Sequence, residues 1–421
     1  MSFFSPLNLK VGWYLAIRQI RRASGWTTAL IVFIMLLTFL NLVVVTGILV
    51  GLVQGITNLY REQQTGDVLV TTLDTKNYID NSQQLISFLK TLPGIEGMTA
   101  RYSGSGTVEA NYNTRTDTNE KANRTGAAIV GIDPVAEDTF AGLEKYVKEG
   151  SYLAPLDYDQ ILIGSQLIDR YSFGEIPGVT PLHNVHPGTK VRVSVNGVTR
   201  EMVVKGIIVT TANSPLSQRV FMPASELSQL LGRTDYNVNE IAIRLDSSTT
   251  PDAFANLLRR SGVSNVAKVR TYLEAIPNGI EEVKSTFAQI GNAFSSVGLV
   301  VASITIFIVI FINALTRRKF IGILKGIGIS GGAIEVAYVF QSLFYAAIGS
   351  AIGLAILYGF LVPYIEAHPI VLPISNAILV APVPGTMIRI ALLVVATVIA
   401  GYIPARMIVR KNTLDSILGR N

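Results

Sequence analysis

The 421-residue sequence has no cysteine and only three histidines. Without cysteine it cannot form a disulfide, a thiol nucleophile or a Cys-ligated metal site. His183 and His186 share a Pro/Gly-rich loop, but without nearby carboxylates or a third ligand they make a poor metal site. No G-x-x-x-x-G-K-[ST] motif is present, so the chain does not hydrolyse ATP by a Walker A loop. The absence of any catalytic constellation disfavours an enzyme.

Charge is missing from three long stretches, residues 23–60, 285–316 and 336–365. Together with a mean hydropathy of +0.42, these stretches indicate a membrane protein. A fourth apolar stretch runs from about residue 385 to residue 408. The four predicted spans hold almost no ionisable side chain at mid-depth, which disfavours an ion channel or a proton-coupled carrier.

The first uncharged stretch is too long for one membrane span. Its 38 residues would form a helix of about 57 Å, against a hydrocarbon core of about 30 Å. We therefore expect residues 27–50 to cross the membrane and the remainder to project as a stalk. Residues 280–292 are a second stalk candidate, before a span near 297–315.

The charges are unevenly distributed. Residues 61–284 hold 22 Lys/Arg and 26 Asp/Glu, whereas the rest of the chain holds 13 and 3. The net charge of +6 therefore reflects basic flanks of membrane spans and not a nucleic-acid surface. The flanks at 10–22 and 317–325 belong inside, which predicts a cell-membrane protein with both termini cytoplasmic and residues 61–279 outside.

The predicted outer domain mixes strands and helices. Asn196-Gly197 between two alternating runs is a strong signal for a type I′ hairpin. We expect two lobes, with residues 104–124 as a polar loop. The predicted strands cover 67–73, 190–195, 198–204 and 240–245, and the predicted helices cover 83–92, 223–231 and 251–260. The fold class is thus an α+β membrane protein, with four transmembrane helices and a large extracytoplasmic α+β domain inserted between helices 1 and 2.

Residues 7–22 form an amphipathic stretch, which we interpret as a helix on the cytoplasmic surface. Its apolar positions at helical spacing are Leu9, Trp13, Ile17 and Ile20. Its cations are Lys10, Arg18, Arg21 and Arg22.

A second amphipathic stretch, residues 316–330, lies between the second and third spans and reads TRRKFIGILKGIGIS. Helical spacing places Ile321, Leu324 and Ile327–Gly328 on one apolar face. The cations Arg317, Arg318, Lys319 and Lys325 then face water. Such a helix would offer an apolar surface to a soluble partner. A basic loop that only sets membrane orientation is the alternative.

Two rows of glycine recur at a spacing of four. Gly47, Gly51 and Gly55 form one row, and Gly349 and Gly353 form the other. Both rows suit close helix packing or a dimer contact. Glycine is also simply common in membrane helices.

The R-R-K-x-I-G-I-L-K-x-I-G-x-S pattern at 317–330 resembles the cytoplasmic coupling helix of FtsX/MacB/LolC-type ABC permeases. The A-x-R-x-x-R-R segment at 16–22 resembles the entry segment of the same family. Between the first two spans, the order of "VGIDP" at 130–134, "GSYL" at 150–153, "ILIG" at 161–164 and the hairpin is similar to the MacB-type periplasmic core domain. The resemblance covers essentially the whole chain. One departure is Phe320, which stands where the family usually has an acidic residue.

The resemblance implies the permease subunit of an ABC transporter, working as a homodimer or heterodimer. It implies a separate ATPase subunit that binds ATP and Mg, and therefore no cofactor in this chain. It also implies export or extraction of a lipophilic, peptide or lipoprotein substrate, with a membrane-fusion or other outer accessory protein as a further partner. The docking residues it implies are Arg317, Arg318, Ile321, Gly322, Leu324, Lys325 and Gly328.

The implied organisation is a cytoplasmic helix (1–22), a first span with stalk (23–60), a MacB-like core (61–279) and a membrane domain with cytoplasmic tail (280–421). An FtsX-like signal transmitter, which activates an outer partner without transport, is the alternative function. A membrane-anchored enzyme is the third.

Overall fold

The computed structural model describes residues 5–113, 122–172, 180–211, 214–276, 278–368, 370–371 and 376–410. The chain divides into two compact units. The helical unit comprises Met1–Leu52, Glu282–Ile370 and Ala377–Asn421. The sheet unit comprises Val53–Glu281 with Val371–Asn376.

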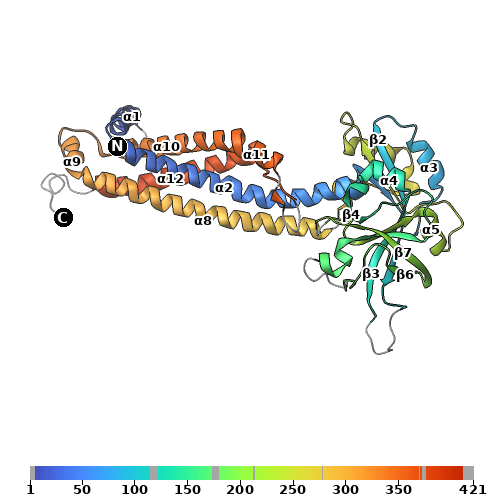
Figure 1. The fold of residues 1–421 in the computed structure, drawn as a ribbon. Helices are drawn as coiled ribbons and strands as arrows, with labels where there is room; N and C mark the ends of the chain where they lie inside the picture. Colours follow the sequence, from blue (N-terminus) through green and yellow to red (C-terminus); the bar gives the residue numbers. More distant parts are fainter. Residues whose placement is uncertain are drawn as a thin grey trace. The chain divides into compact units, whose positions relative to one another are not determined.

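Four long helices run side by side in the helical unit (Figure 1). The segments long and apolar enough to cross a membrane are Gly25–Thr65, Ser285–Thr316, Gly331–Ala367 and Val383–Val409, which confirms the four predicted spans. The helices of this part of the chain are α1 (Pro6–Arg21), α2 (Gly25–Tyr60), α8 (Asn278–Thr316), α9 (Arg318–Gly326), α10 (Gly331–Ile356), α11 (Val362–Ala367) and α12 (Val383–Val409).

Helices α2 and α8 are much longer than a membrane span. They contain 36 and 39 residues, or about 54 and 58 Å of helix. A five-residue π-helix, η1 (Arg61–Thr65), continues α2 into the sheet unit. A second π-helix, η6 (Leu357–Leu361), joins α10 to α11. The two long helices are the predicted stalk-bearing elements.

The sheet unit is built on one ten-stranded sheet, in the order β10-β1-β9-β2-β3-β8-β5-β7-β4, with β6 paired to β2 and β7. The long strand β2 connects its two halves, because its first residues pair with β9 and its last residues pair with β3 and β6. The strands are β1 (Val68–Thr71), β2 (Ile95–Glu109), β3 (Arg124–Ile132), β4 (Val147–Gly150), β5 (Gln160–Gly164), β6 (Lys190–Val195), β7 (Val198–Ile208), β8 (Arg219–Pro223), β9 (Glu240–Leu245) and β10 (Lys268–Thr271). Outside this sheet, β11 (Ile370–Val371) pairs with β12 (Asn376–Ala377).

The four predicted strands and three predicted helices of this unit each overlap an observed element. Asn196 and Gly197 both have positive φ, at 49° and 81°, as a type I′ turn requires. Proline opens α6 (Pro251–Arg260) at its first turn, and α3 (Ser82–Leu89) ends before Pro93. The remaining helices of this unit are α4 (Pro134–Ala141), α5 (Ala224–Leu230) and α7 (Tyr272–Ala275).

The predicted loop at 104–124 extends six residues too far at its start and one residue too far at its end. Strand β2 continues to Glu109 and β3 begins at Arg124, so only residues 110–123 connect them, and 114–121 lie outside the described residues. The Ser/Gly-rich sequence looks like a loop but serves close strand packing. A Cβ at Gly106 would lie 2.5 Å from the Ser194 carbonyl oxygen and from Ile129 Cδ1.

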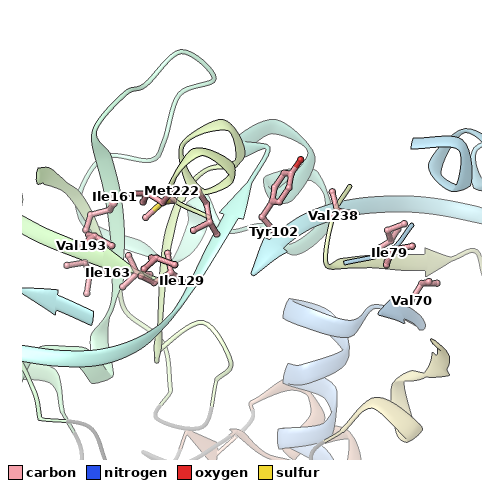
Figure 2. Packing of buried hydrophobic residues seen from close by; sticks show 14 of the residues in the cluster. Val70, Ile79, Tyr102, Ile129, Ile161, Ile163, Val193, Met222 and Val238 are labelled. Carbon is pink, nitrogen blue, oxygen red and sulfur yellow. The ribbon is translucent and has the colours of Figure 1, made fainter. Parts of the chain in front are cut away.

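The core of the sheet unit extends through both halves of the sheet. Figure 2 shows Ile161, Ile163 and Val193 at one end of this cluster and Val70 and Ile79 at the other. These side chains are all buried; four of them come from strands β1, β5 and β6, which are far apart in the sequence, and Ile79 comes from the connection before α3. Along β6, apolar and polar residues alternate, whereas β1 and β5 are apolar and buried over consecutive residues.

Candidate coupling site

The short helix α9 follows α8 after a single residue and ends in a tight reversal (Figure 1). Gly328 has φ of 94°, a left-handed conformation that favours glycine after a helix. The Ile329 N–H donates to the Leu324 carbonyl at 3.0 Å, which closes the end of α9. Ser330 then caps α10 by accepting from the Ala333 N–H at 3.2 Å. Gly328 therefore shapes the chain reversal.

One side of α9 packs on the helical unit itself. Ile321 and Leu324 are only 3% and 8% exposed, and Gly322 is buried. They share a buried cluster with Tyr338 of α10 and Ile408 of α12. This side is therefore occupied by the chain's own helices.

Lys325 also faces this inner side. Its Nζ donates to the Val409 carbonyl at 3.0 Å, at the C-terminal end of α12. A cation at this position complements the partial negative charge of the helix end. Arg317 and Arg318 are half-buried, whereas Lys319 is exposed.

The other side of α9 is apolar and exposed. Phe320, Ile323 and Ile327 are 51%, 52% and 71% exposed, at spacings of three and four residues. These three residues form the outer stripe. Of the predicted docking residues, Ile321, Gly322 and Leu324 are buried against their own chain, and the docking of a partner on α9 stays a prediction.

The comparisons with family models cover both units. Residues 28–261 match the MacB-like periplasmic core domain, and residues 292–413 match the FtsX-like permease C-terminal model. The first match alone spans more than half of the chain. The chain belongs to the MacB/FtsX-like permease family. This is a family of ABC-transporter-type permeases, so the resemblance drawn from the sequence motifs is confirmed.

Solved structures of two relatives resemble the chain at low identity. One is the periplasmic region of MacB from Actinobacillus actinomycetemcomitans, with 14% identity, coverage of 51% of this chain and 92% of that chain, and a TM-score of 0.34. Another is the extracellular domain of the noncanonic ABC-type transporter YknZ from Gram-positive bacteria, with 16% identity, coverage of 48% and 98%, and a TM-score of 0.31. No curated protein matches the chain.

In this MacB/FtsX-like permease, the two glycine rows contact different elements. A Cβ at Gly349 would lie 2.4 Å from Met35 Cβ, and one at Gly353 would lie 2.2 Å from Phe39 Cδ1, so this row lies against α2. The other row is different, because a Cβ at Gly51 would lie 1.7 Å from the Ile378 carbonyl oxygen.

Gly47 likewise accepts a hydrogen bond from the Val380 N–H at 3.2 Å. The segment that packs closely against Gly47 and Gly51 is therefore the extended chain before α12 and not a second helix. Gly55 is buried, and a dimer contact through any of these glycines stays a prediction.

The two long helices are joined by hydroxyl groups within the helical unit. Thr46 Oγ1 of α2 and Ser295 Oγ of α8 are 2.7 Å apart. Each hydroxyl also lies 3.3 Å from a carbonyl oxygen of the other helix, Thr46 from that of Gly291 and Ser295 from that of Leu42, so the hydroxyl that does not donate within the pair can donate to one of them. Such bonds between membrane helices stabilise a fixed register.

Helix α1 packs along α10. Its buried residues are Asn8, Gly12, Ala16 and Gln19. Ser330 Oγ donates to Asn8 Oδ1 at 2.5 Å, and a Cβ at Gly12 would lie 2.5 Å from Val336 Cγ1. The predicted apolar face, which included Trp13, is not the buried one. Close approach to α10 requires small residues, so the inner face is small and polar.

In the sheet unit, a buried ion-pair cluster holds the end of α2. Arg101 of β2 is 1% exposed and Glu137 of α4 is fully buried. Arg101 Nη2 and Nε donate to the two Glu137 carboxylate oxygens at 2.7 and 2.8 Å. Arg101 Nη1 donates to the Gln64 carbonyl of η1 at 2.6 Å and lies 3.2 Å from Glu240 Oε1. One guanidinium thus ties η1 to the sheet and to α4.

The charge of this cluster is well compensated. Burial lowers the pKa of Arg101, but the carboxylates of Glu137 and Glu240 outweigh it, so the pKa of the guanidinium lies above its ordinary value. Thr99 Oγ1 also donates to Glu137 Oε2 at 2.9 Å. A second bond, from Ser214 Oγ to Gln63 Oε1 at 2.6 Å, holds η1 independently. No local pattern predicts this cluster, because Arg101 and Glu137 are 36 residues apart.

The two loop histidines have separate neighbours. His183 Nδ1 lies 3.1 Å from Asp169 Oδ2, whereas His186 Nδ1 lies 2.6 Å from Arg170 Nη1. A guanidinium beside His186 opposes the binding of a cation there.

Proposed function

We propose that this permease works with a separate ABC-type ATPase and that α9 receives the motion of that ATPase. The outer stripe of α9 carries this proposal. The inner side of α9 packs against α10 and α12, while Phe320, Ile323 and Ile327 on its outer side remain exposed. Exposed apolar side chains on a helix that is packed on its other side suit insertion into an apolar groove of a soluble protein. ATP and Mg would be bound by that partner and not by this chain.

The continuity of the long helices supports transmission of motion. Arg317 is the only residue between α8 and α9, so displacement of α9 acts directly on a 39-residue helix. Thr46 and Ser295 couple α8 to α2. Arg101 couples η1, at the end of α2, to the sheet. Every step in this path is a helix or a satisfied hydrogen bond, which suits mechanical coupling.

The substrate would be handled outside the bilayer. The candidate spans carry Asp, Glu, Lys and Arg only toward their ends, at Arg61, Glu62, Glu335, Glu366, Arg389 and Arg406. A polar path through the membrane would need such groups at mid-depth. We therefore propose export or extraction of a lipophilic, peptide or lipoprotein substrate by movement of the sheet unit. A homodimer or heterodimer of permeases would do this, together with a membrane-fusion or other outer accessory protein.

The partnership is tested by purifying the tagged chain from the membranes of its host in mild detergent. We expect an ABC-type ATPase to co-purify and to hydrolyse ATP, whereas a tagged membrane protein of another family should bring none. Recovery of the folded permease without any ABC-type ATPase would contradict the proposal. If the pair forms but moves no substrate in nanodiscs or vesicles, and still activates an outer protein, the FtsX-like signalling function holds instead.

The membrane orientation is tested by single-cysteine labelling, for which the cysteine-free chain offers no background. We expect Gln84→Cys, on exposed α3, to react with an impermeant maleimide in intact cells. Phe320→Cys, at an exposed position of α9, should react only after the membrane is permeabilised, because basic flanks stay inside. The reverse pattern would place the sheet unit in the cytosol and overturn the proposed direction of coupling.

A further inference from the structure

The outward side of α1 combines exposed aromatic and apolar side chains with positive charge. Leu7, Trp13 and Tyr14 are 71%, 55% and 63% exposed. The exposed cations of the helix and of the residue after it are Lys10, Arg18, Arg21 and Arg22. The sequence has no Asp or Glu between residues 5 and 61. In the part of the chain that the structure describes, none of these four cations forms an ion pair.

The position of α1 is fixed from its other side. Gly12 packs closely against Val336 of α10, and Asn8 accepts a hydrogen bond from Ser330. The Trp13 ring contacts the Phe340 ring edge-on, with ring centroids 5.2 Å apart. Because α10 is a candidate membrane span, α1 is held beside the membrane at the end where α10 begins. Half of the Trp13 ring nevertheless remains exposed.

We propose that this side of α1 is a binding surface for anionic phospholipid headgroups. Trp13 and Tyr14 suit the depth of the headgroups, and the chain up to Tyr60 supplies four cations beside them and no Asp or Glu that would oppose a phosphate. Clustered Lys and Arg on an amphipathic helix beside a span attract anionic lipid from a mixed membrane. This inference does not depend on the ATPase partnership.

Helix α1 is also bound to the corner between α9 and α10. Ser330, which caps α10 two residues after the reversal at Gly328, is the residue that binds Asn8 of α1. Lipid held by α1 would therefore stabilise the corner between α9 and α10.

The test uses tryptophan fluorescence, because Trp13 and Trp26 are the only tryptophans. Trp26→Phe leaves Trp13 as the single reporter. The protein is placed in nanodiscs of phosphatidylcholine with one fifth phosphatidylglycerol, and bromine is carried either by the phosphatidylglycerol or by an equal amount of the phosphatidylcholine. We expect brominated phosphatidylglycerol to quench Trp13 at least about threefold more strongly, and the difference to shrink as salt is raised.

The charge dependence is tested in the same background. Lys10→Gln with Arg18→Gln and Arg21→Gln should abolish the preference while leaving the inner face of α1 untouched. Lys90→Gln with Lys148→Gln and Arg260→Gln removes equal charge from exposed positions in the sheet unit and should keep it. Equal quenching by both lipids with the native cations present, or no quenching by either, would overturn the proposal. Loss of the preference in the control variant as well would also overturn it.

Discussion

Replacing Arg101 by methionine should destabilise the sheet unit by about 3–5 kcal/mol. Methionine fills much of the same volume but leaves Glu137, which is fully buried, without its bidentate partner. It also leaves the Gln64 carbonyl of η1 without the bond from the guanidinium. A buried carboxylate that loses its partner pays the full cost of leaving water.

Hydrogen exchange in the full chain, in nanodiscs, measures this effect without separating the units. Amides of β2 should exchange more than about 100-fold faster in Arg101→Met, which corresponds to a loss of about 3 kcal/mol. Lys76→Met removes the exposed pair with Asp80 and should change exchange little, because exposed ion pairs contribute about 0–1 kcal/mol. Unchanged exchange in Arg101→Met would mean that the cluster does not hold the end of α2.

The pairing itself is resolved by a double-mutant cycle. Arg101→Met combined with Glu137→Leu removes both buried charges, and Glu240 is left with its side chain 13% exposed. The double variant should therefore recover part of the stability lost in Arg101→Met alone.

Local signals in the sequence determine much of the fold. Uncharged stretches of 38 and 32 residues predict α2 and α8, because charge is what interrupts a membrane helix. Asn196-Gly197 specifies its hairpin, and Pro251 marks the first turn of α6. In each case the residues that predict the helix or hairpin are themselves part of it.

The faces of the amphipathic helices are not determined in this way. Helix α9 carries two apolar rows, one through Ile321 and Leu324 and one through Phe320 and Ile323. Periodicity identifies both rows but cannot say which packs on α12, because that depends on residues some 80 positions away. On α1 the pattern is misleading, since a glycine suits close contact with α10 better than a large apolar side chain.

Arg101 illustrates the same limit in the sheet unit. Its partners Glu137, Glu240 and Gln64 come from α4, β9 and η1, and the pairing of strands brings them together. The serine- and glycine-rich end of β2 is similar, because only its neighbours β3 and β6 show why Gly106 must lack a side chain.

The two rows of α9 predict opposite results for neighbouring substitutions. Ile323→Asp places a charge on the outer stripe, where the side chain is 52% exposed, so the helical unit should fold normally. A carboxylate in an apolar contact with the ATPase should weaken that contact by 2 kcal/mol or more, or about 30-fold. The measurement is the amount of ATPase that co-purifies, with Ile323→Met as a control that should retain it.

Leu324→Asp should instead impair the folding of the helical unit. Leu324 is 8% exposed among Tyr338, Ala405 and Ile408, so an aspartate there would bury an unpaired charge inside the helical unit. We expect low yield and loss of a monodisperse peak in size-exclusion chromatography, whatever the partner does. If Leu324→Asp instead gave a well-folded permease that lost its ATPase while Ile323→Asp kept it, the inner row would be the docking face. The outer stripe would then contact only water, and α9 would have to separate from α12 to bind the partner.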